Sequence, residues 1–79
     1  MKNLSTEFVL ETIQSSLDHL IAENKRESDR LAKIEQRYKE GSVSLNSLIN
    51  ARDEISRENE KRNAAMFELD ILIKFFKKA

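Results

Sequence analysis

Two long stripes of apolar residues, separated by the only glycine of the chain, constrain this sequence more than any other feature. From residue 10 to 38, and again from 48 to 76, stripe positions recur at an unbroken spacing of three and four. Residues at this spacing share one face of an α-helix, and the pattern is typical of a coiled-coil seam. The first stripe contains Leu10, Ile13, Leu17, Leu20, Asn24, Glu27, Leu31, Ile34 and Tyr38, and the second contains Leu48, Arg52, Ile55, Asn59, Arg62, Met66, Leu69, Ile73 and Phe76.

The two stripes match when the chain is folded back at Gly41. Pairing residues whose numbers sum to 86 places Leu17 opposite Leu69, and six of the nine layers are then wholly apolar. The polar positions also coincide, because Asn24 faces Arg62 in the middle of the seam. The sequence therefore predicts an all-α fold: one antiparallel two-helix coiled-coil hairpin over residues 1–79, completed into a bundle by oligomerisation or by a partner.

The polar gap in the seam has two interpretations. Glu27 and Arg62 occupy adjacent polar layers, so they are placed to pair across the seam. Such a pair would fix the register of the two helices at some cost in stability. We expect instead a locally hydrated stretch of a thin two-helix interface, and the register-fixing pair is the alternative.

The helix ends are predicted from capping residues. Gly41 suits the left-handed conformation that ends many helices, because glycine has no Cβ. Ser5 and Ser44 are suitable N-caps, since a serine hydroxyl accepts a hydrogen bond from an unpaired amide of the first turn. With no proline anywhere in the chain, we expect helices over about 6–39 and 45–77, with a turn at 40–44.

A further apolar stripe lies away from the seam at the open end of the hairpin. At 100° per residue it is turned roughly 120 to 180° from the seam of the second half, and the start of the chain supplies comparable off-seam residues. We expect this surface to bind protein helices, either through self-association into a four-helix bundle or on a different protein. The candidate residues are Leu4, Phe8, Ala64, Phe67, Ile71 and Phe75.

Composition argues against catalysis and against cofactors. The chain has no cysteine and a single histidine, His19, which lies opposite the seam and is expected on the surface. Perturbed acid and base groups need a partly dehydrated pocket, which a two-helix rod does not offer. We therefore expect no enzyme activity, no metal site and no cofactor.

Charge and hydropathy limit the other partners. The net charge is zero at pH 7, and the strip that contains Arg30, Lys33 and Arg37 is interleaved with acidic residues, so nucleic acid is disfavoured as a partner. The most apolar segment, 64–76, is interrupted by Glu68, Asp70 and Lys74, and no membrane span is expected.

The turn region resembles the helical hairpins of TolC-type outer-membrane efflux channels. Those hairpins commonly carry an aromatic residue, then glycine, a serine-containing turn, leucine and alanine, which correspond here to Tyr38, Gly41, Ser44, Leu48 and Ala51. The resemblance spans about forty residues, and it departs from the family at Ser47, where an acidic residue is usual. The later apolar run of the family corresponds to Leu69 and Leu72.

The resemblance implies a periplasmic hairpin that packs into an α-helical barrel and whose tip meets an adaptor protein. Such channels are several hundred residues long, so this chain corresponds to one of their hairpins only. We accordingly expect a non-catalytic protein-interaction module of a secretion or transport assembly.

Two other functions fit the same pattern. One is a free-standing co-chaperone that masks a secretion subunit with the face of Phe67, Ile71 and Phe75. The other is a dimeric RNA-binding regulator with the architecture of the plasmid regulator Rop, in which Arg30 and Lys33 would contact RNA. A complete chain would be cytoplasmic, whereas an excised channel hairpin would be periplasmic.

Overall fold

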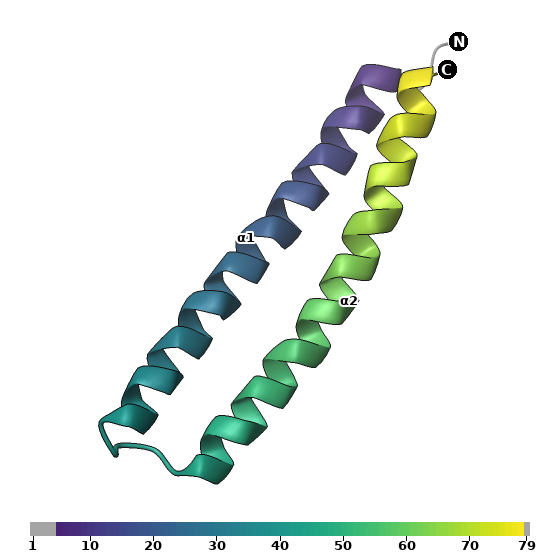
Figure 1. Ribbon diagram of the computed structural model, residues 1–79. Helices are drawn as coiled ribbons and strands as arrows, with labels where there is room; N and C mark the ends of the chain where they lie inside the picture. Colours follow the sequence, from purple (N-terminus) through teal and green to yellow (C-terminus); the bar gives the residue numbers. More distant parts are fainter. Residues whose placement is uncertain (1–4, 79) are drawn as a thin grey trace.

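Residues 5–78 form two antiparallel helices joined by one turn. The computed structural model describes residues 5–78, in which α1 spans Thr6–Lys39 and α2 spans Leu45–Lys78. The helices pack along each other in opposite directions, so the start of α1 and the end of α2 lie at the same end of the hairpin (Figure 1). The predicted all-α hairpin is confirmed, and the helix bounds agree with the predicted ones to within one residue. Of the predicted binding residues, Leu4 lies outside the described residues.

Both helices begin at the predicted serine caps. The backbone of Ser5 is extended (φ −69°, ψ 155°), and its Oγ accepts a hydrogen bond of 3.1 Å from the amide of Phe8. At the start of α2, the Oγ of Ser44 accepts a hydrogen bond of 3.1 Å from the amide of Ser47. Each bond satisfies an amide that has no partner within its own helix, so the caps set where the helices start.

The turn is built around Gly41, the residue with a positive φ (81°). The amide of Gly41 donates to the carbonyl of Tyr38 at 3.0 Å, and the amide of Ser42 donates to the carbonyl of Arg37 at 2.8 Å. These two bonds form the Schellman motif, which satisfies the last carbonyls of α1 and reverses the chain. The left-handed backbone at position 41 is therefore what brings α2 back along α1.

Replacing Gly41 by alanine is expected to lower the free energy of unfolding by about 1 to 2 kcal/mol, the penalty of left-handed backbone for a residue with a Cβ. A Cβ at this position meets no atom within 4 Å, so the penalty comes from the backbone rather than from a clash. Urea unfolding followed by circular dichroism measures the change. Gly41→Asn is the matched control, since asparagine tolerates this conformation better. Equal losses for the two variants would contradict the conformational explanation.

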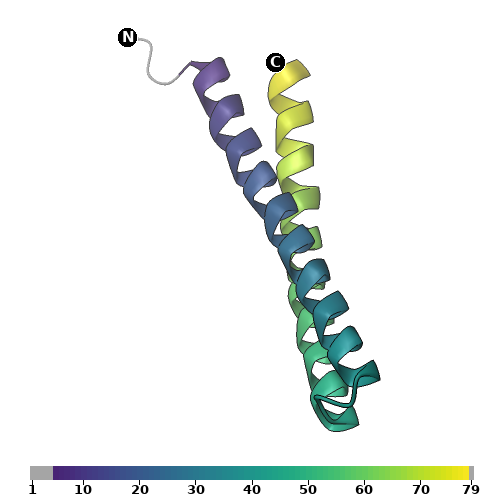
Figure 2. The ribbon, with the colours of Figure 1, turned by 90° about the vertical axis from the view of Figure 1, so that its left-hand side faces the viewer.

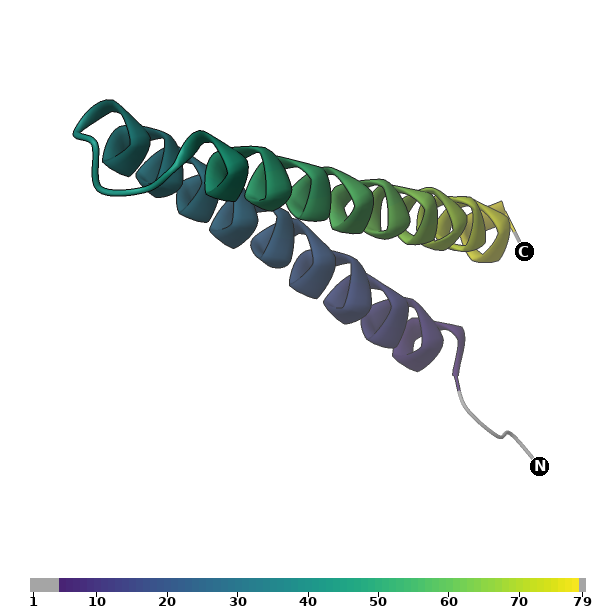
Figure 3. The same cartoon turned by 90° about the horizontal axis from the view of Figure 1, so that it is seen from below.

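The hairpin is a rod rather than a compact domain. Its extents are 63 × 17 × 15 Å and its radius of gyration is 18.0 Å, whereas a compact domain of this length has a radius of gyration of about 12 Å. In Figure 1 the two helices are farther apart near the turn. In Figure 2, which is turned by 90°, they are farther apart at the open end. The two helices therefore wind around each other. The view from below shows the same divergence toward the termini (Figure 3).

The core is thin, and its buried side chains belong to α2. Among the described residues, the buried hydrophobic side chains are Leu48, Ile55 and Ile73, each with an exposed fraction of 6 or 7%. Most other seam residues are half-buried, whereas Tyr38 and Arg52 are exposed. This distribution follows from the architecture, because a single neighbouring helix covers a seam side chain from one direction only.

Candidate protein-interaction surfaces

Polar side chains meet across the seam near its middle. The Nε of Arg62 donates to the Oδ1 of Asn24 at 2.6 Å, and the Nδ2 of Asn24 donates to the Oδ1 of Asn63 at 3.1 Å. The Asn24 and Arg62 contact is one of the pairs whose numbers sum to 86, so the predicted register is confirmed at this layer. The Nη2 of Arg62 is buried without a hydrogen-bond partner. We refer to Asn24, Arg62 and Asn63 as the polar layer.

Glu27 does not form the ion pair with Arg62 that was considered as the alternative. Its carboxylate accepts a hydrogen bond of 2.7 Å from the Nε of Arg30, three residues along the same helix. Arg30 also reaches across to α2, where its Nη2 donates to the Oε1 of Glu54 at 3.0 Å. The local partner competes successfully because residues three apart on a helix are already neighbours.

This pairing keeps Glu27 ionised. The hydrogen bond from Arg30 lowers the pKa of the Glu27 carboxyl below its ordinary value, partial burial opposes the shift, and the charges of Arg30, Arg62 and Arg26 add to the lowering. The hydrogen bonds to Glu27 and Glu54 correspondingly raise the pKa of Arg30. Both shifts favour the charged forms, so Glu27 and Arg30 act as a fixed ion pair at neutral pH.

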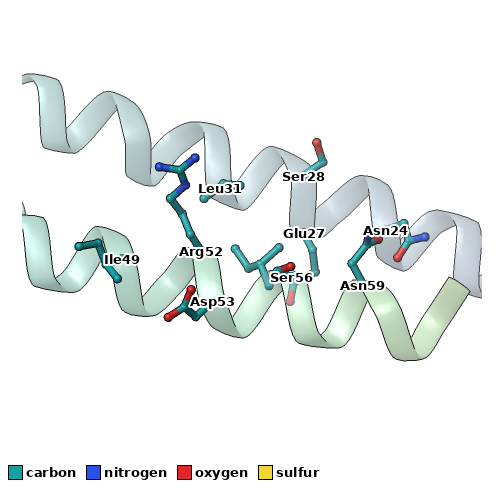
Figure 4. A pocket seen from close by; sticks show the side chains of 10 residues that line it. Asn24, Glu27, Ser28, Leu31, Ile49, Arg52, Asp53, Ser56 and Asn59 are labelled. Atoms are coloured by element: carbon teal, nitrogen blue, oxygen red, sulfur yellow. The ribbon is translucent and has the colours of Figure 1, made fainter.

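A groove opens beside the seam near the polar layer. It has a volume of about 640 Å³ and is open to solvent along part of its length. Figure 4 shows Glu27 extending from α1 toward α2 and Arg52 extending from α2 toward α1. The groove has room for water, and the locally hydrated stretch stays a prediction. Its lining residues are Asn24, Glu27, Ser28, Leu31, Ile49, Arg52, Asp53, Ile55, Ser56 and Asn59.

The predicted binding surface lies at the open end, on both outer sides of the hairpin. Phe67, Ile71 and Phe75 on α2 have exposed fractions of 68%, 50% and 64%, and Phe8 on α1 is 52% exposed. Ala64 is also exposed. We call Ala64, Phe67, Ile71 and Phe75 the aromatic stripe; Phe8 lies on the other helix, away from the seam. Clusters of large exposed apolar side chains mark interaction sites more often than single ones do.

The aromatic stripe is in contact with the seam at the end of α2. The rings of Phe75 and Phe76 meet edge to face, with centroids 5.6 Å apart and an interplanar angle of 81°. Phe76 is a half-buried seam residue, whereas Phe75 faces outward. The seam and the outer surface are thus continuous through two aromatic rings, and only the outer one lacks a neighbouring helix.

Several exposed apolar residues were not among the predicted binding residues. Leu45 and Ile49 are 53% and 45% exposed and lie close to the turn, where Tyr38 is 40% exposed. Ile21 and Leu72 are 49% and 42% exposed. Tyr38 is itself a seam position, whereas Leu45 and Ile49 share one helix face at a spacing of four, and this two-residue pattern is the signal that could have identified them.

Part of the basic strip on α1 is paired with acidic neighbours on the same helix. Lys25 and Asp29 form an ion pair at 3.8 Å, and Arg26 pairs with Glu23. These are (i, i+4) and (i, i+3) contacts along one helix, as predicted for a self-stabilising surface. Exposed pairs of this kind contribute little to stability, about 0.5 kcal/mol each.

Residues 5–78 contain neither a cluster of metal ligands nor a membrane-spanning helix. Over this range, no three His, Asp or Glu side chains converge in a way that would hold a metal ion. Neither helix, within the same range, is long and apolar enough to cross a membrane. No protein-family model, curated protein or solved structure matches the chain.

Proposed function

We propose that this hairpin is a non-catalytic protein-interaction module that presents the outer face of α2 to helices of another subunit. The observation that carries the proposal is the exposure of the aromatic stripe, in which Phe67 and Phe75 each leave about two-thirds of their surface uncovered. The same segment also packs its seam residues against α1. A helix that is apolar on opposite faces is normally covered on both.

The stripe is suited to binding helices rather than extended chains. Phe67, Ile71 and Phe75 are four residues apart, so they form a ridge along one helix face. A ridge of this kind packs into the groove between side chains of a facing helix, with a distance between axes of about 8 to 10 Å. Burial of such aromatic and aliphatic anchors supplies most of the affinity in interfaces of this type.

We further propose that the assembly belongs to secretion or transport. The support is the turn, where Tyr38, Gly41 and Ser44 match the helical hairpins of TolC-type channels in sequence. Gly41 and Ser44 have backbone and capping roles that such a reversal requires. The co-chaperone alternative uses the same aromatic stripe. The RNA-binding alternative receives less support, because Arg30 is already held by Glu27 and Glu54.

Photo-crosslinking tests the protein-binding role. A benzoylphenylalanine at position 67 should give a defined covalent protein adduct in cells that express the chain. Arg57 is the matched control position, because it lies on the outer face of α2 but outside the aromatic stripe. Adducts at 67 and not at 57 support the proposal, whereas no adduct at 67, or equal adducts at both positions, overturns it.

A further inference from the structure

We infer that the partner on the aromatic stripe is a second copy of this chain, bound with the two α2 helices antiparallel about a twofold axis close to Ile71. This inference rests on the proposed function and names the occupant of the same surface. Three features of the hairpin lead to it: its excess of accessible surface, the order of residues along the stripe, and the place where the stripe ends.

The first feature is the surface that one hairpin leaves exposed. The accessible surface is 6273 Å² for a mass of 9.2 kDa, whereas a compact monomer of that mass exposes about 4900 Å². The difference of about 1400 Å² exceeds the roughly 800 Å² that each partner buries in an interface of standard size. This excess is spread along the rod, and the exposed side chains of Phe67, Ile71 and Phe75 are the apolar part of it that a second copy would cover.

The second feature is that the stripe is complementary to itself in the antiparallel direction. An interface with a twofold axis uses the same patch on both copies, so the residues must match when their order is reversed. Pairing positions whose numbers sum to 142 places Phe67 opposite Phe75 of the second copy and Ile71 opposite its own equivalent. Every central layer is then apolar.

The charges beside the stripe favour the same orientation. Asp70 and Lys74 form an ion pair at 3.0 Å within α2, and at 100° per residue both lie along one edge of the stripe. In the antiparallel dimer, Asp70 of each copy lies near Lys74 of the other, so each charge gains an opposite neighbour. In a parallel pair, whose twofold axis runs along the helices, this edge would instead face the opposite edge of the second copy, and the pairing of Asp70 with Lys74 of the other copy would be lost.

The third feature is the limit of the stripe toward the turn. Beyond Ala64 the outer face of α2 continues with Glu60, Arg57 and Asp53, which are charged and exposed. The overlap of the two α2 helices is thus confined to residues 64–78, a length of about 22 Å at 1.5 Å per residue, with apolar pairs from Phe67 to Phe75 and with Ala64 facing Lys78 at each end. The two hairpins overlap only at their open ends, and their turns point in opposite directions.

Sedimentation equilibrium of the full chain, over a range of concentrations, tests whether the dimer forms. The wild type is expected to reach twice the monomer mass, and Phe67→Asp with Ile71→Asp is expected to weaken self-association at least about 30-fold, because central anchors carry most of the affinity. Asp53→Ala with Arg57→Ala changes the same face outside the stripe and should leave the dimer intact. A wild type that stays monomeric throughout overturns the inference.

Cysteine crosslinking tests the orientation without removing an aromatic residue, and it does not depend on whether the aspartate variant folds. The chain has no cysteine of its own. Ala64→Cys and Lys78→Cys proteins, mixed and oxidised, should form the disulfide-linked heterodimer in preference to either homodimer, because 64 and 78 face each other in the antiparallel pair. Preferred homodimers of each variant would show a parallel pair and overturn the inference.

These outcomes separate the inference from the proposed function. A monomeric protein whose position 67 still crosslinks to a different protein in cells overturns the second copy as occupant and leaves the interaction role in place. A monomeric protein that crosslinks to nothing removes both.

Discussion

Replacing Ile55 by alanine is expected to lower the free energy of unfolding by about 2 to 4 kcal/mol, the usual range for deleting a buried isoleucine side chain. Ile55 is 6% exposed and is one of three buried hydrophobic side chains among the described residues. It also lines the groove beside the seam. Because the layers toward the open end are separated from it by polar positions, few apolar neighbours can close around the lost volume.

Urea unfolding followed by circular dichroism at one fixed protein concentration measures this loss, since self-association makes apparent stability depend on concentration. Ile21→Ala is the matched control: it removes the same atoms from a side chain that is 49% exposed on α1. It should cost less than about 1 kcal/mol, as expected for a surface position. Similar losses for the two variants would mean that the seam is not the main source of stability.

Much of the fold could be predicted because a coiled-coil seam is a repeated signal. The spacing of the two stripes and their match about Gly41 specify which residues face inward and in which direction the chain returns. The structure places Leu48, Ile55 and Ile73 in the core, and all three are seam positions. The helix ends could be predicted equally well, because Ser5 and Ser44 cap the helices with hydrogen bonds to nearby amides and Gly41 adopts the left-handed backbone that ends α1.

The contacts of the long polar side chains could not be predicted in the same way. Periodicity gives the sector of the helix that a residue occupies, but it does not give the direction of a flexible side chain. Glu27 thus pairs with Arg30 rather than with Arg62, and Glu54 contributes a cross-helix contact from outside the seam. The exposed Leu45 and Ile49 near the turn were missed for a different reason, because a single spacing of four is too short a pattern to predict a surface.

Removing the polar layer is the change that is expected to stabilise the hairpin most. Replacing Asn24 and Arg62 together by leucine is expected to raise the free energy of unfolding by about 1 to 2 kcal/mol, the lower part of the range seen when polar clusters give way to apolar packing, because both residues are half-buried. The buried Nη2 of Arg62 has no hydrogen-bond partner, so the wild type carries a desolvation cost that the double variant lacks. Urea unfolding measures the difference.

The single variants distinguish this explanation from a general gain in hydrophobicity. Asn24→Leu alone leaves the Arg62 guanidinium without the acceptor that it contacts at 2.6 Å, and an unpaired buried polar group costs about 1 to 3 kcal/mol, with more for a charged one. Asn24→Leu should therefore destabilise the hairpin although it adds apolar surface. The two substitutions are then strongly non-additive, as expected for residues in direct contact.

In the same double variant, the alignment of the two helices along each other should be less precise. The polar layer makes slippage of one helix along the other unfavourable, because a shifted Asn24 would no longer meet Arg62. Spin labels at Ser28 and Ser56, which lie on opposite helices beside the groove, report the register as a distance distribution. The distribution should be narrow in the wild type and broader in the double variant. A double variant that is less stable than the wild type, with an equally narrow distribution, would show that the polar layer stabilises the hairpin and that apolar packing alone sets the register.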